Sequence, residues 1–148
     1  ERALRADQAG IIAYVDRTAE AGLVYTYKLE AEGRPDLSQT TGEIMLPVES
    51  VRLYQNHPNP FNPSTTIPFT VPGSLEARRN VRLAVYDVNG KLVKTLANGP
   101  LPGGRHEGRW DGRNDRGESV ASGIYFVRLR AGDFEASRKI VLPRLAIV

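Results

Sequence analysis

The part of the sequence best suited to chemistry is an oxygen-rich stretch that follows the single tryptophan, Trp110. Carboxylate and amide oxygens that converge on one point are the ligands that Ca²⁺ prefers. The spacing does not match an EF-hand loop, and two arginines lie inside the stretch. We therefore favour a polar turn whose Asp and Asn side chains cap the backbone, and we predict no metal cofactor. The weak calcium candidates are Asp111, Asn114 and Asp115, with Glu118 close behind.

Other residue types that commonly carry catalysis are scarce. The chain has no cysteine and two histidines, His57 and His106. Thiolate chemistry is excluded, and histidine-based catalysis or metal binding has little to build on. There is also no Gly-x-Ser-x-Gly nucleophile elbow and no Gly-x-x-x-x-Gly-Lys phosphate loop. We therefore predict that this chain is not itself an enzyme and binds no cofactor.

A ligand platform built on aromatic side chains is an alternative. Trp110 could stack on a sugar ring, as exposed tryptophans do in carbohydrate-binding modules, although a sole tryptophan more often anchors a core. Tyr14, Tyr54 and Tyr86 could contribute to such a platform, but their spacing gives no evidence that they converge. An accessory carbohydrate- or protein-binding module therefore stays open as a second hypothesis.

Charge is unevenly spread along the chain. Residues 1–48 carry five Lys and Arg against eight Asp and Glu, a net of −3, and residues 49–148 carry fifteen against nine, a net of +6; the two sum to the +3 of the whole chain. The basic residues of the second part alternate singly with apolar residues, and no recognition helix or RNA-binding aromatic motif accompanies them. We interpret them as solvated strand faces and predict no nucleic-acid partner.

We predict no membrane-spanning segment. The longest run without a charged residue, 55–75, contains five prolines and reads as loop and strand. The chain begins with Glu1, so we expect it to be a piece of a longer protein.

Period-two alternation of apolar and polar residues indicates an all-β fold with minimal helix, apart from a short possible helix over 74–79. Asn89-Gly90 and Ala131-Gly132-Asp133 are tight-turn signals between apolar runs. Seven short strands within one hundred residues are typical of an immunoglobulin-like antiparallel β-sandwich, which we predict for 49–148. The predicted strands cover 51–56, 64–71, 81–88, 91–97, 104–110, 123–130 and 134–142.

Residues 1–48 offer only three predicted strands, at 11–16, 24–31 and 42–46, too few for an independent sandwich. This segment resembles the C-terminal half of a fibronectin type III domain. The resemblance rests on the corner turn and tyrosine of Ala21-Gly22-Leu23-Val24-Tyr25 and on the alternation of Tyr27, Leu29 and Ala31. It implies an exposed strand edge, which would pair with another copy, dock on the next domain or stay mobile. Self-association through 1–48 is therefore a possible interaction.

The prolines between the first two predicted strands of the sandwich are unusual in their spacing. Pro58, Pro60 and Pro63 cannot donate backbone hydrogen bonds and push the preceding residues into extended geometry, so we expect the chain to cross from one sheet to the other here. The short amides of Asn56, Asn59 and Asn62 can bond the freed backbone groups. Phe61 is expected to plug the end of the core.

Residues 51–142 closely resemble the C-terminal sorting domain of the bacterial type IX secretion system. That domain is related to the Ig-like insert of the flagellar hook-capping protein. Three stretches carry the resemblance: Asn59-Pro60-Phe61-Asn62-Pro63-Ser64-Thr65-Thr66-Ile67, Val85-Tyr86-Asp87-Val88-Asn89-Gly90 and Gly123-Ile124-Tyr125-Phe126-Val127.

The resemblance implies a non-catalytic secretion, sorting and surface-attachment module at the end of a larger exported protein such as a hydrolase. Outer-membrane secretion machinery would recognise this module, and the protein would be delivered to the outer-membrane surface or the medium. A fold-maintaining role alone for Gly123 and Tyr125 stays equally open, as does a purely structural assembly domain. The recognition residues it implies are Pro58, Asn59, Pro60, Phe61, Asn62, Pro63, Gly123, Tyr125, Val127, Lys139 and Val141.

Overall fold

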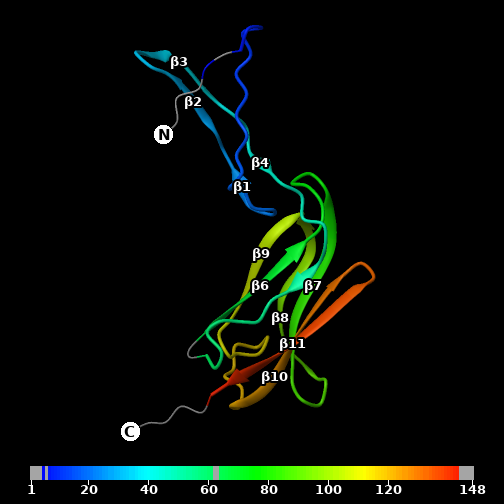
Figure 1. Ribbon diagram of the computed structural model, residues 1–148. Helices are drawn as coiled ribbons and strands as arrows, with labels where there is room; N and C mark the ends of the chain where they lie inside the picture. Colours follow the sequence, from blue (N-terminus) through cyan, green and yellow to red (C-terminus); the bar gives the residue numbers. More distant parts are fainter. Residues whose placement is uncertain (1–4, 6, 62–63, 144–148) are drawn as a thin grey trace.

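The computed structural model describes residues 5, 7–61 and 64–143, and every regular element within these ranges is a β-strand (Figure 1). The predicted all-β fold is confirmed. Across the described part of the chain, no helix of the length and hydropathy of a membrane span occurs. Asn62 and Pro63, which belong to the predicted recognition motif, lie outside the described residues.

Seven strands form two antiparallel sheets, which pack face to face around one core. One sheet has the order β5-β6-β9 and the other the order β11-β10-β7-β8. The predicted number of strands is confirmed. The strands are β5 (Arg52–Leu53), β6 (Thr65–Val71), β7 (Arg78–Tyr86), β8 (Leu92–Pro102), β9 (Gly104–Trp110), β10 (Gly123–Ala131) and β11 (Phe134–Leu142).

The core follows from the alternation, because successive side chains of a strand point to opposite faces. Alternate residues of β6, β7 and β10 are buried against one another. The two sheets approach closely at Gly108 of β9, where a Cβ atom would lie 2.4 Å from Leu83 Cδ2 of β7. A side chain at this position would therefore push the sheets apart. The core residues include Leu53, Ile67, Phe69, Leu83, Val85, Val127, Leu129 and Ile140.

The predicted sheet crossover at the prolines is wrong. The chain returns to the sheet it left, because β5 and β6 pair in antiparallel register, with Arg52 opposite Thr70 and Leu53 opposite Phe69. The intervening segment reaches the other sheet through its own hydrogen bonds, which are described below.

Three local expectations also differ from the structure. The possible helix at 74–79 is a bend that leads into β7, which begins at Arg78. The predicted strand at 11–16 has no regular structure. A strand that was not predicted, β3 (Arg34–Thr40), pairs with β2 (Lys28–Ala31) around the turn at Gly33, whose φ is +74°.

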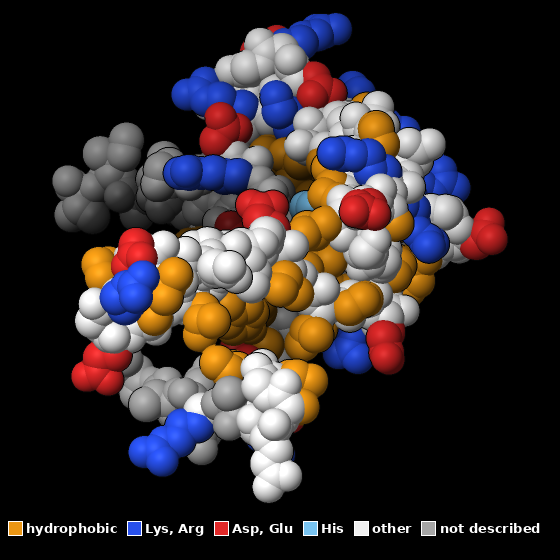
Figure 2. Space-filling view, turned by 90° about the horizontal axis from the view of Figure 1, so that it is seen from above, with side chains coloured by type: hydrophobic (Ala, Val, Ile, Leu, Met, Phe, Trp, Pro, Cys, Tyr) orange, Lys and Arg blue, Asp and Glu red, His pale blue; other side chains and the backbone are white. Residues whose placement is uncertain are grey.

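The N-terminal part is a β-segment without a core of its own. Besides β2 and β3 it contains β1 (Val24–Tyr25) and β4 (Ile44–Met45), which pair with each other. Gly22 is the one buried residue among the described residues before 49. An open groove of about 1050 Å³ is lined by exposed apolar side chains such as Ile12 and Leu46. Seen from the end that carries this segment, hydrophobic side chains lie at the surface between charges of both signs (Figure 2). The boundary at 48/49 and the fibronectin III resemblance stay predictions.

Candidate recognition site

The proline segment comprises residues 55–61. A network of hydrogen bonds between polar groups holds the base of this segment, where it meets the start of β6. The amide of Asn56, only 2% exposed, donates to the Pro58 carbonyl oxygen (3.2 Å) and to Thr65 Oγ1 (3.0 Å). The Thr65 hydroxyl in turn donates to the same Pro58 oxygen (2.8 Å). Both His57-Pro58 and Asn59-Pro60 are cis peptide bonds. Because prolines cannot donate, side chains supply the bonds that hold this segment.

The proline segment lies along the edge of the last strand, β11. Asn59 Oδ1 accepts a hydrogen bond from the Val141 amide (3.2 Å), 82 residues away in the chain. The Val141 carbonyl oxygen accepts one from the Phe61 amide (3.4 Å). The Gln55 side chain donates to the Lys139 carbonyl oxygen (2.9 Å). The segment therefore covers the end of β11 that would otherwise be an unpaired strand edge.

Three aromatic rings close the core behind this contact. Trp110 is completely buried and lies between Phe61, with ring centroids 5.3 Å apart, and Tyr125, at 5.1 Å in an edge-to-face arrangement. The Trp110 indole donates to the Arg113 carbonyl oxygen (2.9 Å). A sugar ring has no access to a buried indole, so the hypothesis that Trp110 stacks on a sugar is wrong. Phe61 plugs the core as expected.

Tyr125 combines a core position with an anchored hydroxyl. Its hydroxyl donates to the Ala121 carbonyl oxygen (2.6 Å). Burial raises the pKa of this phenol, with a smaller contribution from the negative charge of Asp87. The hydroxyl therefore remains a proton donor at neutral pH and ties the approach to β10 onto the core.

The other predicted residues of β10 and β11 have different environments. Gly123 opens β10 with a φ of +146°, a conformation that side chains rarely adopt, opposite Leu142 in the register. Val127 is completely buried in the core. Lys139 is exposed on the outer face of its sheet, opposite Phe126, which is itself 38% exposed.

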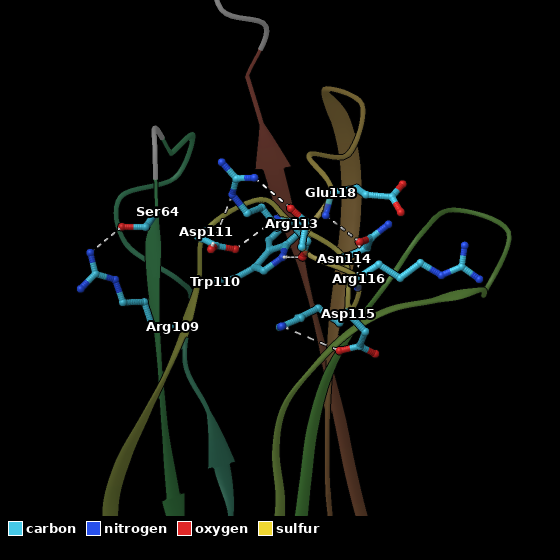
Figure 3. Close-up of polar contacts among 11 residues, drawn as sticks. Ser64, Arg109, Trp110, Asp111, Arg113, Asn114, Asp115, Arg116 and Glu118 are labelled. Atoms are coloured by element: carbon cyan, nitrogen blue, oxygen red, sulfur yellow. Dashed lines mark hydrogen bonds and ion pairs between the residues drawn. The ribbon is translucent and has the colours of Figure 1, made fainter.

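In the polar loop, residues 111–118, Asp111 and Asn114 turn side-chain oxygens toward the backbone of the loop itself (Figure 3). Asp111 Oδ1 accepts from the Arg113 amide (3.1 Å), and Asn114 Oδ1 accepts from the amides of Arg116 and Glu118 (3.0 Å each). Within the described ranges, no group of three or more His, Cys, Asp or Glu side chains could hold a metal ion. These oxygens act as turn caps in the structure.

Asp115 of the polar loop fastens the opposite edge of the four-stranded sheet. Its amide donates to the Val93 carbonyl oxygen (3.0 Å), and its Oδ1 accepts from the Thr95 amide (3.2 Å). Both outer strands of this sheet, β11 and β8, are thus covered at the same end of the sandwich. Nothing in the sequence pattern signalled this role of Asp115.

The structure brings most of the predicted recognition residues to one end of the sandwich, which we call the recognition end. Asn59 and Phe61 bond to Val141, and Phe61 and Tyr125 both pack on Trp110. Val127 lies deeper in the core and has no exposed surface. Sequence reasoning gave no role to Gln55 and Thr65, which hold the segment in place.

Comparisons with known proteins find a matching family and similar solved structures. Residues 65–133 match the FlgD Ig-like domain family. Among solved structures, the chain is similar to dimeric latent PorU from Porphyromonas gingivalis, with 19% identity and a TM-score of 0.52 over 72% of this chain and 11% of that one. It is also similar to PorZ of the same organism, an essential bacterial surface component of the type-IX secretion system, with 20% identity and a TM-score of 0.42 over 62% of this chain and 11% of that one. No curated protein matches the chain.

The fold is therefore that of an immunoglobulin-like β-sandwich, as predicted from the strand pattern. The chain spans about a tenth of the length of the PorU and PorZ chains.

Proposed function

We propose that this chain is a non-catalytic sorting module of a larger exported bacterial protein, read by outer-membrane secretion machinery. The observation that carries the proposal is the contact between Asn59 and Val141. It joins the proline motif to the last strand, two segments that the resemblance to type IX sorting domains singles out separately. A folded surface composed of both segments can be recognised only after the sandwich has formed.

The charge and exposure of the recognition end support this role. Pro58, Asn59 and Pro60 are exposed, as is the Lys139 side chain on the neighbouring strand. The residues behind them are buried, since Phe61 is 1% exposed and Trp110 is fully enclosed. Binding residues are often found on surface loops that a packed scaffold positions.

The parent protein and its destination follow as part of the proposal. We infer an exported parent enzyme such as a hydrolase, delivered to the outer-membrane surface or the medium, with upstream domains of the parent as covalent neighbours. The match to the FlgD Ig-like domain family supports a non-catalytic module.

An export assay tests the proposal. The full chain is fused behind a periplasmically targeted reporter in a bacterium that has a type IX secretion system. We expect the reporter at the cell surface or in the medium, and retention when residues 134–148 are removed. A reporter that stays in the periplasm, although the full chain attached to it resists proteolysis as a folded domain does, would overturn the proposal.

A matched pair of substitutions makes the assay specific for the recognition end. Lys139→Glu reverses an exposed charge beside the proline segment, and Lys28→Glu reverses an exposed charge on β2, in the N-terminal segment. Both leave the core untouched. We expect Lys139→Glu to reduce export and Lys28→Glu to leave it unchanged.

A further inference from the structure

The start of β9 contacts the N-terminal segment, at the opposite end of the sandwich from the recognition end. The Arg105 amide donates to the Gly22 carbonyl oxygen (3.1 Å), and Arg105 Nε donates to the Ala21 carbonyl oxygen (3.0 Å). Arg105 Nη2 also forms an ion pair with Glu20 Oε2 (3.1 Å). One residue of the sandwich thus binds three successive residues of the N-terminal segment, the turn 20–22.

The approach of the turn is so close that it requires glycine. Gly22 is buried and has a φ of +81°. A Cβ atom at this position would lie 2.8 Å from both Arg105 Cγ and Val48 Cγ2, closer than real Cβ contacts. On the other side of the contact, a Cβ on Gly104 would lie 2.9 Å from Met45 Sδ. The two surfaces fit because neither glycine has a side chain.

The connecting residues are fastened at a second place. Val48 forms an isolated antiparallel bridge with Gly73, whose amide donates to the Val48 carbonyl oxygen (3.1 Å). The Gly22 amide donates to the Leu46 carbonyl oxygen (2.9 Å). Residues 46–48 are therefore bonded to the turn on one side and to the sandwich on the other, which leaves no free linker between the parts.

We propose that this contact is a rigid joint, in which Gly104 and Arg105 form a docking surface for the glycine turn of the preceding segment. The two parts then move as one body. In Figure 1 the N-terminal strands lie at the upper end, and the C-terminal end of β11 lies at the lower end. The joint thus holds the recognition end pointing away from the preceding chain. Arg105 therefore positions the sandwich relative to the N-terminal segment.

The hydrogen bonds from the Arg105 amide and the Arg105 side chain to the Gly22 and Ala21 carbonyl oxygens, together with the close packing, hold the joint, whereas the ion pair adds little. Glu20 and Arg105 are 60% and 46% exposed at their side chains, and exposed ion pairs contribute little to stability. Relative motion is the ordinary expectation for two parts joined by a small interface. The proposal therefore predicts, against this expectation, that the N-terminal segment and the sandwich keep a single relative orientation in solution.

A distance measurement between spin labels tests the joint. Because the chain has no cysteine, Glu43→Cys and Asn89→Cys provide two labelling positions, both exposed, in the full-length chain. Double electron–electron resonance should give one narrow distance distribution. Arg105→Ala should broaden it, and Gly22→Ala should broaden it most, whereas Glu20→Gln should leave it nearly unchanged. The proposal would be overturned if the doubly labelled chain without further substitutions gave a distance distribution as broad as that of Gly22→Ala. It would also be overturned if neither Arg105→Ala nor Gly22→Ala changed the width of the distribution.

Gly33→Ala is the matched control. Gly33 has a φ of +74°, similar to that of Gly22, but a Cβ atom there meets nothing within 4 Å. It carries the same backbone cost without the clash, so its distribution should stay narrow. Fluorescence of the buried Trp110 reports in each variant whether the sandwich is folded. If Gly22→Ala does not fold, Arg105→Ala, an exposed position, decides the test. The result is independent of whether the chain is sorted.

Discussion

Removing the Asn56 amide should release the base of the proline segment. In Asn56→Ala, Thr65 loses a donor to its hydroxyl oxygen and Pro58 loses one of two donors, while the Gln55 amide loses the Asn56 oxygen, 2.6 Å away. A neutral hydrogen bond contributes about 1 kcal/mol net, and a buried polar group left unpaired costs about 1–3 kcal/mol. We expect a loss of about 2–3 kcal/mol in the free energy of unfolding.

Thermal unfolding followed by Trp110 fluorescence measures this loss, because Trp110 is the only tryptophan and is fully buried. A change of about 2–3 kcal/mol corresponds to a decrease in Tm of about 8–24 °C for a sandwich of about 100 residues. Asn98→Ala, at an exposed position of β8, is the control and should change the stability by less than about 0.5 kcal/mol.

A double-mutant cycle with Thr65→Val isolates the network. Asn56 and Thr65 are in direct contact, so their losses should be non-additive by about 0.5–3 kcal/mol. If Asn56→Ala costs no more than Asn98→Ala, or if the two substitutions are strictly additive, the reasoning about this network is refuted.

Further predictions concern other parts of the molecule. Asn59→Ala should leave the fold intact but speed amide hydrogen exchange in the last strand, as measured by NMR; unchanged exchange would mean that the proline segment does not protect that edge. Trp110→Ala should cost about 3–5 kcal/mol in unfolding free energy by chemical denaturation, and a loss below about 1 kcal/mol would contradict its core role. The hydrogen bonds from Thr18, and then from the Tyr27 hydroxyl, lower the pKa of Asp16. The stabilisation from these bonds is present above the ordinary carboxyl pKa and is lost as the pH falls through the lowered value; an NMR titration should show this pKa rising in Tyr27→Phe. Adding Ca²⁺ should leave the Tm unchanged, because the oxygens of the polar loop already accept backbone hydrogen bonds; an increase in Tm with Ca²⁺ concentration would reveal a metal site.

The strands of the sandwich could be predicted because local patterns determine them. Alternation in β6, β7 and β10 shows in the sequence which side chains enter the core, and Gly90 and Gly132 adopt positive φ at the tight turns as expected. Local patterns do not determine which strands pair when they are distant in sequence. A strand needs a partner as well as suitable residues, which explains why the apolar run at 11–15 forms no strand.

The unpredicted strand β3 shows that a segment without an alternating pattern can form a strand when a pairing strand lies beside it. Residues 34–40 are polar on both faces and contain Pro35, so no alternation marks them. They form a strand because the turn at Gly33 returns the chain alongside β2. In both cases the presence or absence of a pairing strand decided the result.

The recognition end was predictable in its residues and unpredictable in its contacts. Proline spacing indicated that Asn56 and Asn59 would bond backbone groups, and both do. Which strand Asn59 would reach depends on the register of β11 against a segment 82 residues away. Register of this kind is set by packing of the whole core. The expected crossover failed for the same reason, since bonds to β11 hold the segment without a change of sheet.

Site-specific photo-crosslinking in an exporting bacterium tests the central claim most directly. A photoreactive residue replaces Lys139, beside the proline segment, or Lys28, on the exposed β2 strand of the N-terminal part. If secretion machinery reads the recognition end, position 139 should form an adduct with an outer-membrane protein during export and position 28 should not. Adducts from position 28 alone, or equal adducts from both positions, would contradict the account.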